Sequence, residues 1–127
     1  MDTLTIEEKP KTVVKHAIQL EVQEERQVIV HCFMPCEAGD GVRIWRSTFL
    51  VAEDNTRSKL LYWEGISTAP EWTWALEKGM FRFTLIFSGL PADCKVFTLM
   101  EDIPQAGGFH VTGIKRNKQD VYKVRVG

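Results

Sequence analysis

Cysteine and histidine side chains are the first candidates for chemistry in this chain, because thiolates and imidazoles bind metal ions and act in catalysis. The sequence holds three cysteines and three histidines, and His31-Cys32 lies close to Cys36. Zinc sites typically use two pairs of ligands at short spacing, whereas this chain offers one such pair. We therefore predict no metal site. We expect buried thiols at Cys32, Cys36 and Cys94, with a disulfide between two of them as the alternative.

A cysteine nucleophile would need a base, such as histidine, within hydrogen-bonding distance. His31 and Cys32 are adjacent in a predicted strand, and adjacent side chains in a strand point to opposite faces of the sheet. They therefore cannot pair directly. His16 or His110 could reach a thiol only through a contact that the sequence does not indicate. We predict that the protein is not an enzyme.

Glycine-rich and acidic loops are the next candidates. Gly39-Asp40-Gly41 and Gly107-Gly108 do not join a predicted strand to a predicted helix, which is the context in which such loops hold phosphate. The adjacent acids Glu53-Asp54 and Glu101-Asp102 lack the ordered spacing of a calcium-binding loop. We interpret the glycines as turn residues and the acids as loop residues, and we expect no cofactor.

Tryptophans are the remaining candidates, and the chain has four. We expect Trp45 and Trp63 to be core residues because they lie in predicted strands. Trp72 and Trp74 follow Glu71 in an ambiguous segment, and exposed aromatic side chains offer a large contact area at low entropic cost. We take Trp72, Trp74 and Glu71 as candidate binding residues for a protein surface or a sugar ring. The alternative is that the segment folds over a sheet edge and buries both rings.

The alternation of apolar and polar residues predicts the strands that carry these candidates. The clearest strand places Phe81, Phe83, Leu85 and Phe87 on one face. Turns rich in Gly, Pro and Asx residues separate the strands, as is typical of sandwiches and barrels. The eight predicted strands cover residues 14–22, 27–34, 42–52, 58–64, 80–87, 94–100, 109–114 and 120–126.

Residues 68–79 are compatible with two conformations. Thr68 and Glu71 fit the capping box of a short helix, which Gly79 would end. The spacing of Trp72 and Trp74 by two residues suits an extended chain instead. We predict at most one short helix in the protein, and both alternatives stay open.

The length of 127 residues suits one domain, and 44% hydrophobic with 26% charged residues is typical of a globular protein. We expect residues 1–12 to form a polar tail or an edge element. Residues 13–127 are predicted to form a single all-β domain, an antiparallel two-sheet sandwich of about eight strands.

Charge and hydropathy exclude some classes of partner. The formal net charge is −1, which gives no general basis for binding nucleic acid. The C-terminal segment is locally basic, and we interpret it as a guarded strand face, with a patch for an anion or an acidic partner as the alternative; its basic residues are Lys115, Arg116, Lys118, Lys123 and Arg125. No apolar run is long enough to span a membrane. The N-terminus as written does not resemble a signal peptide, so we expect a cytoplasmic protein, although a mature exported form would look the same.

The segment from Phe83 to Pro91 leads into residues 96–101 and then 108–114. Together with residues 42–45 and 60–66, these segments resemble bacterial immunoglobulin-like β-sandwich domains of unassigned function, some of which precede a thioredoxin-like domain in longer exported chains. The resemblance covers about residues 28–114. It implies an immunoglobulin-like fold, and it implies no redox chemistry because no thioredoxin-like half lies within this sequence.

These observations predict a non-enzymatic module that acts through protein interaction, either as a homodimer or as an accessory partner. The alternative is a module that binds a small ligand or a carbohydrate through Trp72 and Trp74.

Overall fold

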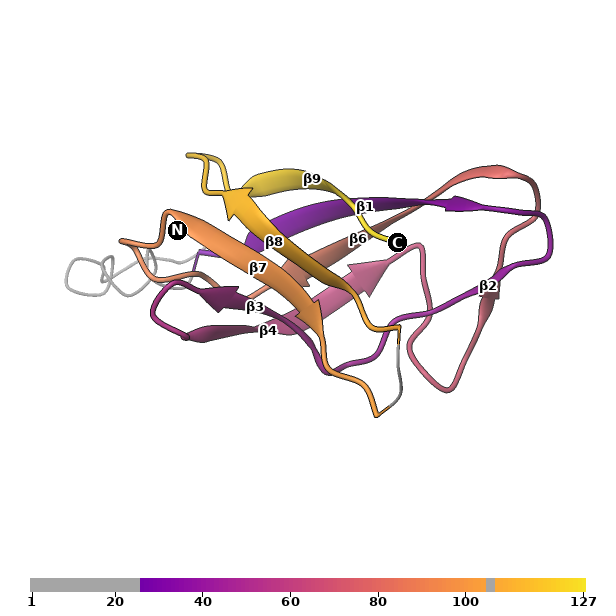
Figure 1. Ribbon diagram of the computed structural model, residues 1–127, viewed down its shortest axis with the longest axis horizontal. Helices are drawn as coiled ribbons and strands as arrows, with labels where there is room; N and C mark the ends of the chain where they lie inside the picture. The colour runs from indigo at the N-terminus through magenta and orange to yellow at the C-terminus, as the bar shows by residue number, and fades with distance from the viewer. Residues whose placement is uncertain (1–25, 105–106) are drawn as a thin grey trace, which may run out of the picture.

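Nine strands make up the described part of the computed structural model, which covers residues 26–104 and 107–127 (Figure 1). No helix occurs in these two ranges, so the all-β prediction is confirmed for them. The tail predicted at residues 1–12 and the strand predicted at 14–22 lie outside the described residues. The strands are β1 (Val28–Cys36), β2 (Gly41–Val42), β3 (Thr48–Ala52), β4 (Arg57–Glu64), β5 (Thr73–Trp74), β6 (Gly79–Phe87), β7 (Val96–Glu101), β8 (His110–Lys115) and β9 (Val121–Arg125).

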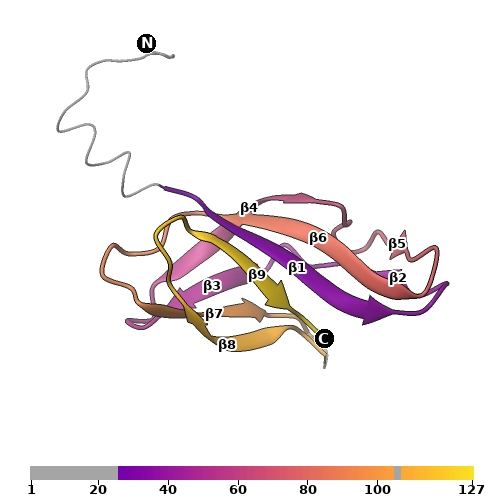
Figure 2. The same cartoon turned by 90° about the horizontal axis from the view of Figure 1, so that it is seen from above.

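Seven of the strands form one continuous mixed sheet in the order β8-β7-β3-β4-β6-β1-β9, and β2 pairs with β5 in a small separate sheet. The edge strands β8 and β9 are joined by residues 116–120 alone. The sheet must therefore curl until its two edges approach each other, as Figures 1 and 2 show. The expected two-sheet sandwich is not confirmed, because a single hydrogen-bonded ladder runs through all seven strands.

The pairing of β1 with β9 is parallel, so the prediction of a purely antiparallel sheet is wrong at this edge. Val30 lies opposite Tyr122, and Cys32 lies opposite Val124. The other neighbours in the large sheet are antiparallel. The parallel pair arises because the curled sheet brings the last strand back beside the first described one, a contact between segments about ninety residues apart that local alternation does not encode.

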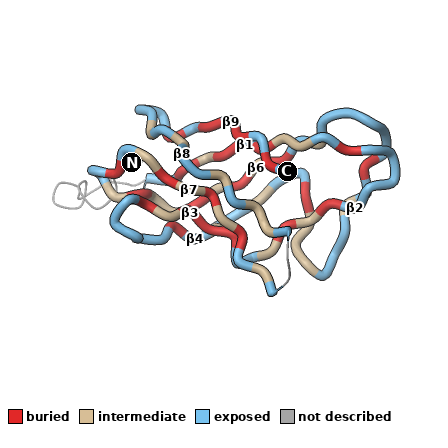
Figure 3. The backbone as a smooth tube through the Cα atoms, viewed as in Figure 1, coloured by how far each residue is buried: buried red, intermediate tan, exposed pale blue. Residues whose placement is uncertain are grey.

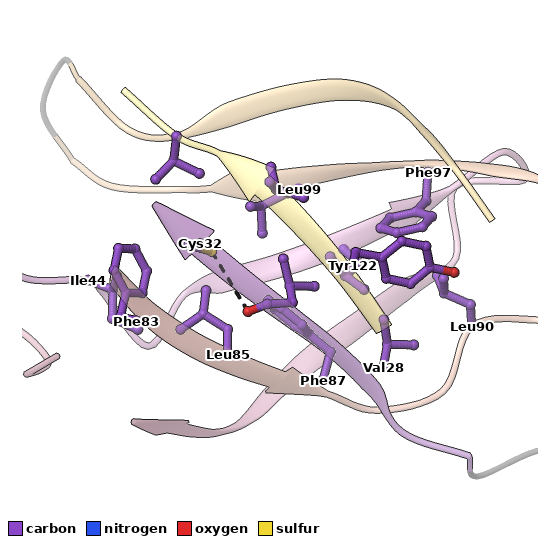
Figure 4. Packing of buried hydrophobic residues seen from close by; sticks show 14 of the residues in the cluster. Val28, Cys32, Ile44, Phe83, Leu85, Phe87, Leu90, Phe97, Leu99 and Tyr122 are labelled. Carbon is purple, nitrogen blue, oxygen red and sulfur yellow. Dashed lines mark hydrogen bonds between the residues drawn. The ribbon is translucent and has the colours of Figure 1, made fainter. Parts of the chain in front are cut away.

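The core lies inside the curl and is built from alternate residues of the strands (Figure 4). Phe83, Leu85 and Phe87 of β6 are 4%, 0% and 0% exposed, as their alternation predicts. Phe97 of β7 packs edge-on against Tyr122 of β9 with 4.9 Å between ring centroids, so the core bridges the two sides of the curl. Full burial of each large apolar side chain stabilises the fold by roughly 1.5–3 kcal/mol.

The strand predicted at residues 42–52 is interrupted, and that prediction is wrong in the middle. Val42 belongs to β2, and Ile44 makes an isolated parallel bridge to Thr68. The chain then turns, because the backbone N–H of Thr48 and its hydroxyl both donate to the carbonyl oxygen of Trp45, at 3.0 and 2.6 Å. Apolar alternation continues on both sides of this turn, which is why the sequence pattern does not reveal it.

Residues 68–79 contain no helix, so the helical alternative is wrong. The backbone N–H of Glu71 donates to the carbonyl of Thr68 at 2.9 Å, which makes one turn at the position of the predicted capping box. The chain then extends, and β5 pairs with β2 through Trp74 opposite Gly41. The loops at this end of the molecule are largely exposed (Figure 3).

Candidate functional site

Trp72 and Trp74 form an exposed aromatic pair at the end of the molecule that carries β2 and β5. Their side chains are 48% and 58% exposed, so the alternative in which both rings are buried is wrong. The ring centroids lie 6.0 Å apart, and the ring planes are tilted by 31°. Residues two apart in an extended chain share one face, which explains why both rings lie side by side.

Gly41 of β2 allows the two rings to lie against the backbone. A Cβ atom at this position would lie 2.8 Å from Cζ3 of Trp74 and 3.0 Å from Cε3 of Trp72. Both distances are shorter than carbon atoms tolerate without displacement. A side chain at this position would therefore displace the rings, and we define Trp72, Trp74 and Gly41 as the tryptophan site.

Arg43, the residue after β2, holds the ring of Trp72 in place. Its Cζ atom lies 3.8 Å from the ring centroid of Trp72 and 5.6 Å from that of Trp45. Its Nη1 donates to the carbonyl of Pro70 at 3.0 Å, which anchors the guanidinium. A cation held over an aromatic face stabilises the arrangement by about 0.5–1 kcal/mol when exposed. The ring of Trp72 is thus held in a defined position by contacts within the chain.

Trp45 and Trp63, which we expected in the core, are both half-buried. Trp63 packs against the core cluster, so that prediction is confirmed in part. Trp45 lies in the turn before β3 and lines a cleft of about 170 Å³, together with Trp72 and Phe109. It therefore belongs to the margin of the tryptophan site.

Glu101 at the end of β7 lines this cleft and is 8% exposed, although we expected a loop residue. Its Oε2 accepts from the backbone N–H of Trp45 at 2.9 Å, and its Oε1 accepts from the N–H of Phe109 at 3.3 Å. Burial raises the pKa of the Glu101 carboxyl, and the hydrogen bonds from Trp45, Phe109 and Thr48 offset only part of that effect. Both oxygens already have partners, so this carboxylate holds the cleft together. The signal in the sequence is its alternation with Phe97 and Leu99 on one strand face.

Glu71, the third predicted binding residue, is exposed beside the aromatic pair. Its hydrogen bonds involve its backbone: the N–H donates to Thr68, and the carbonyl accepts from the hydroxyl of Ser67 at 3.2 Å. The structure therefore brings Trp72 and Trp74 together, whereas it places Glu71 in the turn that precedes them.

The three cysteines are buried free thiols, so the disulfide alternative is wrong. The Sγ of Cys32 points into the core and donates to the carbonyl of Val30 at 3.9 Å (Figure 4). Burial raises the pKa of Cys32 to about 12, which keeps this thiol protonated and unreactive at neutral pH. His31 lies on the opposite, outer face, where its Nδ1 is 2.8 Å from the hydroxyl of Thr84. Among the residues the structure describes, no group of three or more His, Cys, Asp or Glu side chains could hold a metal ion.

Asp120 is a buried carboxylate that sequence reasoning did not single out, and it lies in the turn between β8 and β9. It is 1% exposed. Its Oδ1 and Oδ2 accept from Nε and Nη2 of Arg116 at 2.6 and 3.0 Å, and Oδ1 also accepts from the hydroxyl of Tyr122 at 2.8 Å. Burial alone would raise the pKa of Asp120, but the bonds from Arg116 and Tyr122 and the charges of Arg116 and Arg26 outweigh it and lower the pKa.

The basic residues of the predicted C-terminal strand face therefore fall into two groups, one bound within the fold and one exposed. Arg116 also donates to the carbonyls of Pro91 and Cys94, at 2.9 and 3.2 Å, so it closes this end of the fold and is not a free surface cation. The lysines of the group, with Arg125, are exposed as expected; they are Lys115, Lys118 and Lys123.

No family model matches the chain, and neither curated proteins nor solved structures give a match. The resemblance to bacterial immunoglobulin-like domains therefore stays a prediction. Within residues 26–104 and 107–127, the structure has no helix with the length and apolar character needed to cross a membrane. The site is thus characterised by its own geometry: a fixed, exposed tryptophan pair beside a small cleft.

Proposed function

We propose that this protein is a non-enzymatic interaction module that binds another protein through the tryptophan site. The observation that carries the proposal is the pair of half-exposed rings held in place by Gly41 and Arg43. Large aromatic side chains dominate the binding energy of many protein interfaces. Rings that are already positioned lose little conformational entropy on binding, which favours their use as anchors.

Two further apolar side chains at the same end favour a protein surface as the partner. Leu76, in the loop between β5 and β6, is 92% exposed, and Met80 at the start of β6 is 44% exposed. The backbone of this loop is held by the carbonyl of Ala75, which accepts from the N–H of Gly39 at 2.8 Å. Tryptophan, methionine and arginine are enriched at protein interfaces.

A carbohydrate-binding module is the alternative, and the exposure of Trp74 supports it. A sugar ring stacks on an open aromatic face, and Trp74 has a larger exposed fraction than Trp72. The tilt of 31° between the two rings does not make a flat platform for successive sugars, and Arg43 occupies one face of Trp72. The geometry therefore supports the protein partner better.

Site-specific photo-crosslinking in the native host tests this proposal. A crosslinker replaces Leu76, and a matched probe replaces Tyr62, which is 55% exposed on β4 in the large sheet. We expect a discrete crosslinked protein from position 76 that disappears in the Trp72→Ala/Trp74→Ala variant. Equal products from position 62, or products that persist in the double variant, would contradict the proposal.

Two solution measurements separate the forms of the proposal. Sedimentation velocity over a range of concentrations distinguishes a homodimer, which dissociates in the double variant, from a different partner. Tryptophan fluorescence titrated with a glycan panel tests the alternative. A saturable change lost in Trp74→Ala would favour carbohydrate over protein.

A further inference from the structure

A second concave surface lies on the outer face of the large sheet and is independent of the tryptophan site. The concavity is open to solvent and has a volume of about 490 Å³, within the size range of pockets that hold small molecules. Strands β1, β4, β6 and β9 all contribute to it. The lining residues used below are His31, Phe33, Glu64, Arg82, Thr84 and Lys123.

The pairing of the strands places four polar residues in one row across this surface. Glu64 lies opposite Thr84, Thr84 lies opposite His31, and His31 lies opposite Lys123. Neighbouring strands are about 4.8 Å apart, so the row extends about 14 Å between the Cα atoms of Glu64 and Lys123. The row therefore has a negative charge at one end and a positive charge at the other.

His31 occupies a fixed position within the row. Its Nδ1 lies 2.8 Å from the hydroxyl oxygen of Thr84, and the tautomer decides which of the two groups donates. This contact uses one ring nitrogen and leaves Nε2 for a ligand. A side chain already held by a neighbour loses less conformational entropy when it binds.

Arg82 and Phe33 form a second row of the surface, two residues along β6 and β1 from Thr84 and His31. They are direct cross-strand partners, and the Cζ atom of Arg82 lies 5.9 Å from the ring centroid of Phe33. Arg82 and Lys123 thus bring two positive charges to the same groove, against the single negative charge of Glu64. Phe33 adds an apolar surface between them.

From this arrangement we infer that the groove binds a small organic carboxylate with an apolar body. The carboxylate accepts charge-assisted hydrogen bonds from Arg82 and Lys123, which are roughly twice as strong as neutral ones. The apolar body lies on Phe33. Glu64 lies at the end of the row opposite Lys123, where it can accept a donor group at the other end of a longer ligand.

A pair of isosteric probes tests the charge requirement. Phenylacetate and phenylacetamide are titrated separately into the full chain, and backbone amide shifts are followed by NMR. We expect saturable shifts at His31, Thr84 and Lys123 with phenylacetate, and binding at least tenfold weaker with the uncharged amide, since a hydrogen bond to a charged group contributes about 1.5–3 kcal/mol. Equal binding of both probes, or linear shifts without saturation, would overturn the inference.

Matched variants test the residues. Lys123→Gln and Arg82→Gln should each weaken phenylacetate binding about tenfold, whereas Lys115→Gln on the other edge strand and Arg57→Gln on β4 should leave it unchanged. All four side chains are exposed, and an unchanged melting temperature shows that each variant is folded. If the control variants lose affinity as much as the groove variants, general surface charge explains binding and the groove is not the site.

Discussion

Each end of the molecule contains a buried carboxylate, and the two carboxylates differ in their hydrogen-bond partners and in the direction of their pKa shifts. Asp120, at the end where β8 turns into β9, is paired with the guanidinium of Arg116 and the hydroxyl of Tyr122. Glu101, near the tryptophan site, accepts from the backbone N–H groups of Trp45 and Phe109. The pKa of Asp120 is lowered, whereas burial raises the pKa of Glu101.

This difference matches the different roles of the two ends. A charged partner compensates the burial of Asp120 and holds the turn between β8 and β9. Neutral donors compensate Glu101 only in part, and the cleft beside it stays open next to the exposed rings. We therefore expect the closed end to contribute more to stability; if the tryptophan end binds a partner as proposed, it does so at little cost to the fold.

The largest expected effect is at Asp120. Asparagine tolerates the backbone φ of 57° found there, so Asp120→Asn removes the charge with little backbone strain. Because Arg116 then lacks its buried counter-charge, we expect a loss of about 3 kcal/mol in the free energy of unfolding. Urea denaturation at pH 7 measures it, with the exposed Asp102→Asn as control. A loss no larger than that of the control would mean that the Arg116 pair does not hold this end.

A smaller loss is expected at Glu101. An amide has one acceptor oxygen and would turn its NH₂ group toward a backbone N–H, so Glu101→Gln should cost about 1 kcal/mol under the same conditions. A cost equal to that of Asp120→Asn would remove the distinction between the two ends.

The pH dependence of these two variants should differ in sign. The ionised Asp120 stabilises the fold above the pKa it has in the unfolded chain, about 3.9, and this contribution is lost as pH falls through its lower folded pKa. Glu101 behaves oppositely: its contribution is fully present below the unfolded pKa, about 4.3, and is lost as pH rises through its higher folded pKa. The cost of Asp120→Asn should therefore shrink below about pH 4, whereas the cost of Glu101→Gln should grow between pH 7 and pH 4. Denaturation series at each pH would show parallel changes if one mechanism governed both ends.

The smallest effect on stability is expected at Gly41. A Cβ in Gly41→Ala would displace the rings of Trp72 and Trp74, but both rings are half-exposed, so the free energy of unfolding should change by less than about 1 kcal/mol. Near-UV circular dichroism should change clearly, and crosslinking through position 76 should fall. In a Trp72→Ala/Trp74→Ala background the same substitution should have no further effect, because the contact it disturbs is gone. An additive effect in that background would place the role of Gly41 elsewhere.

Alternation along single strands was a reliable guide to parts of this fold. Phe83, Leu85 and Phe87 are buried as their spacing predicts, and His31 and Cys32 lie on opposite faces as adjacent strand residues must. The pairing partners of the strands could not be read in the same way. The interruption after Ile44 and the non-helical conformation of residues 68–79 depend on contacts with other segments.

The sequence by itself therefore determined the predominantly β character, the inner face of β6 and the presence of two tryptophans spaced by two residues. These features depend on a strand period of two, which a few consecutive residues encode. Only the tertiary structure decided that β1 lies parallel to β9, that Asp120 and Glu101 are buried with different partners, and that Gly41 supports the aromatic pair. The physical reason is that burial and register depend on residues far apart in the chain, which come together only when the sheet curls around its core.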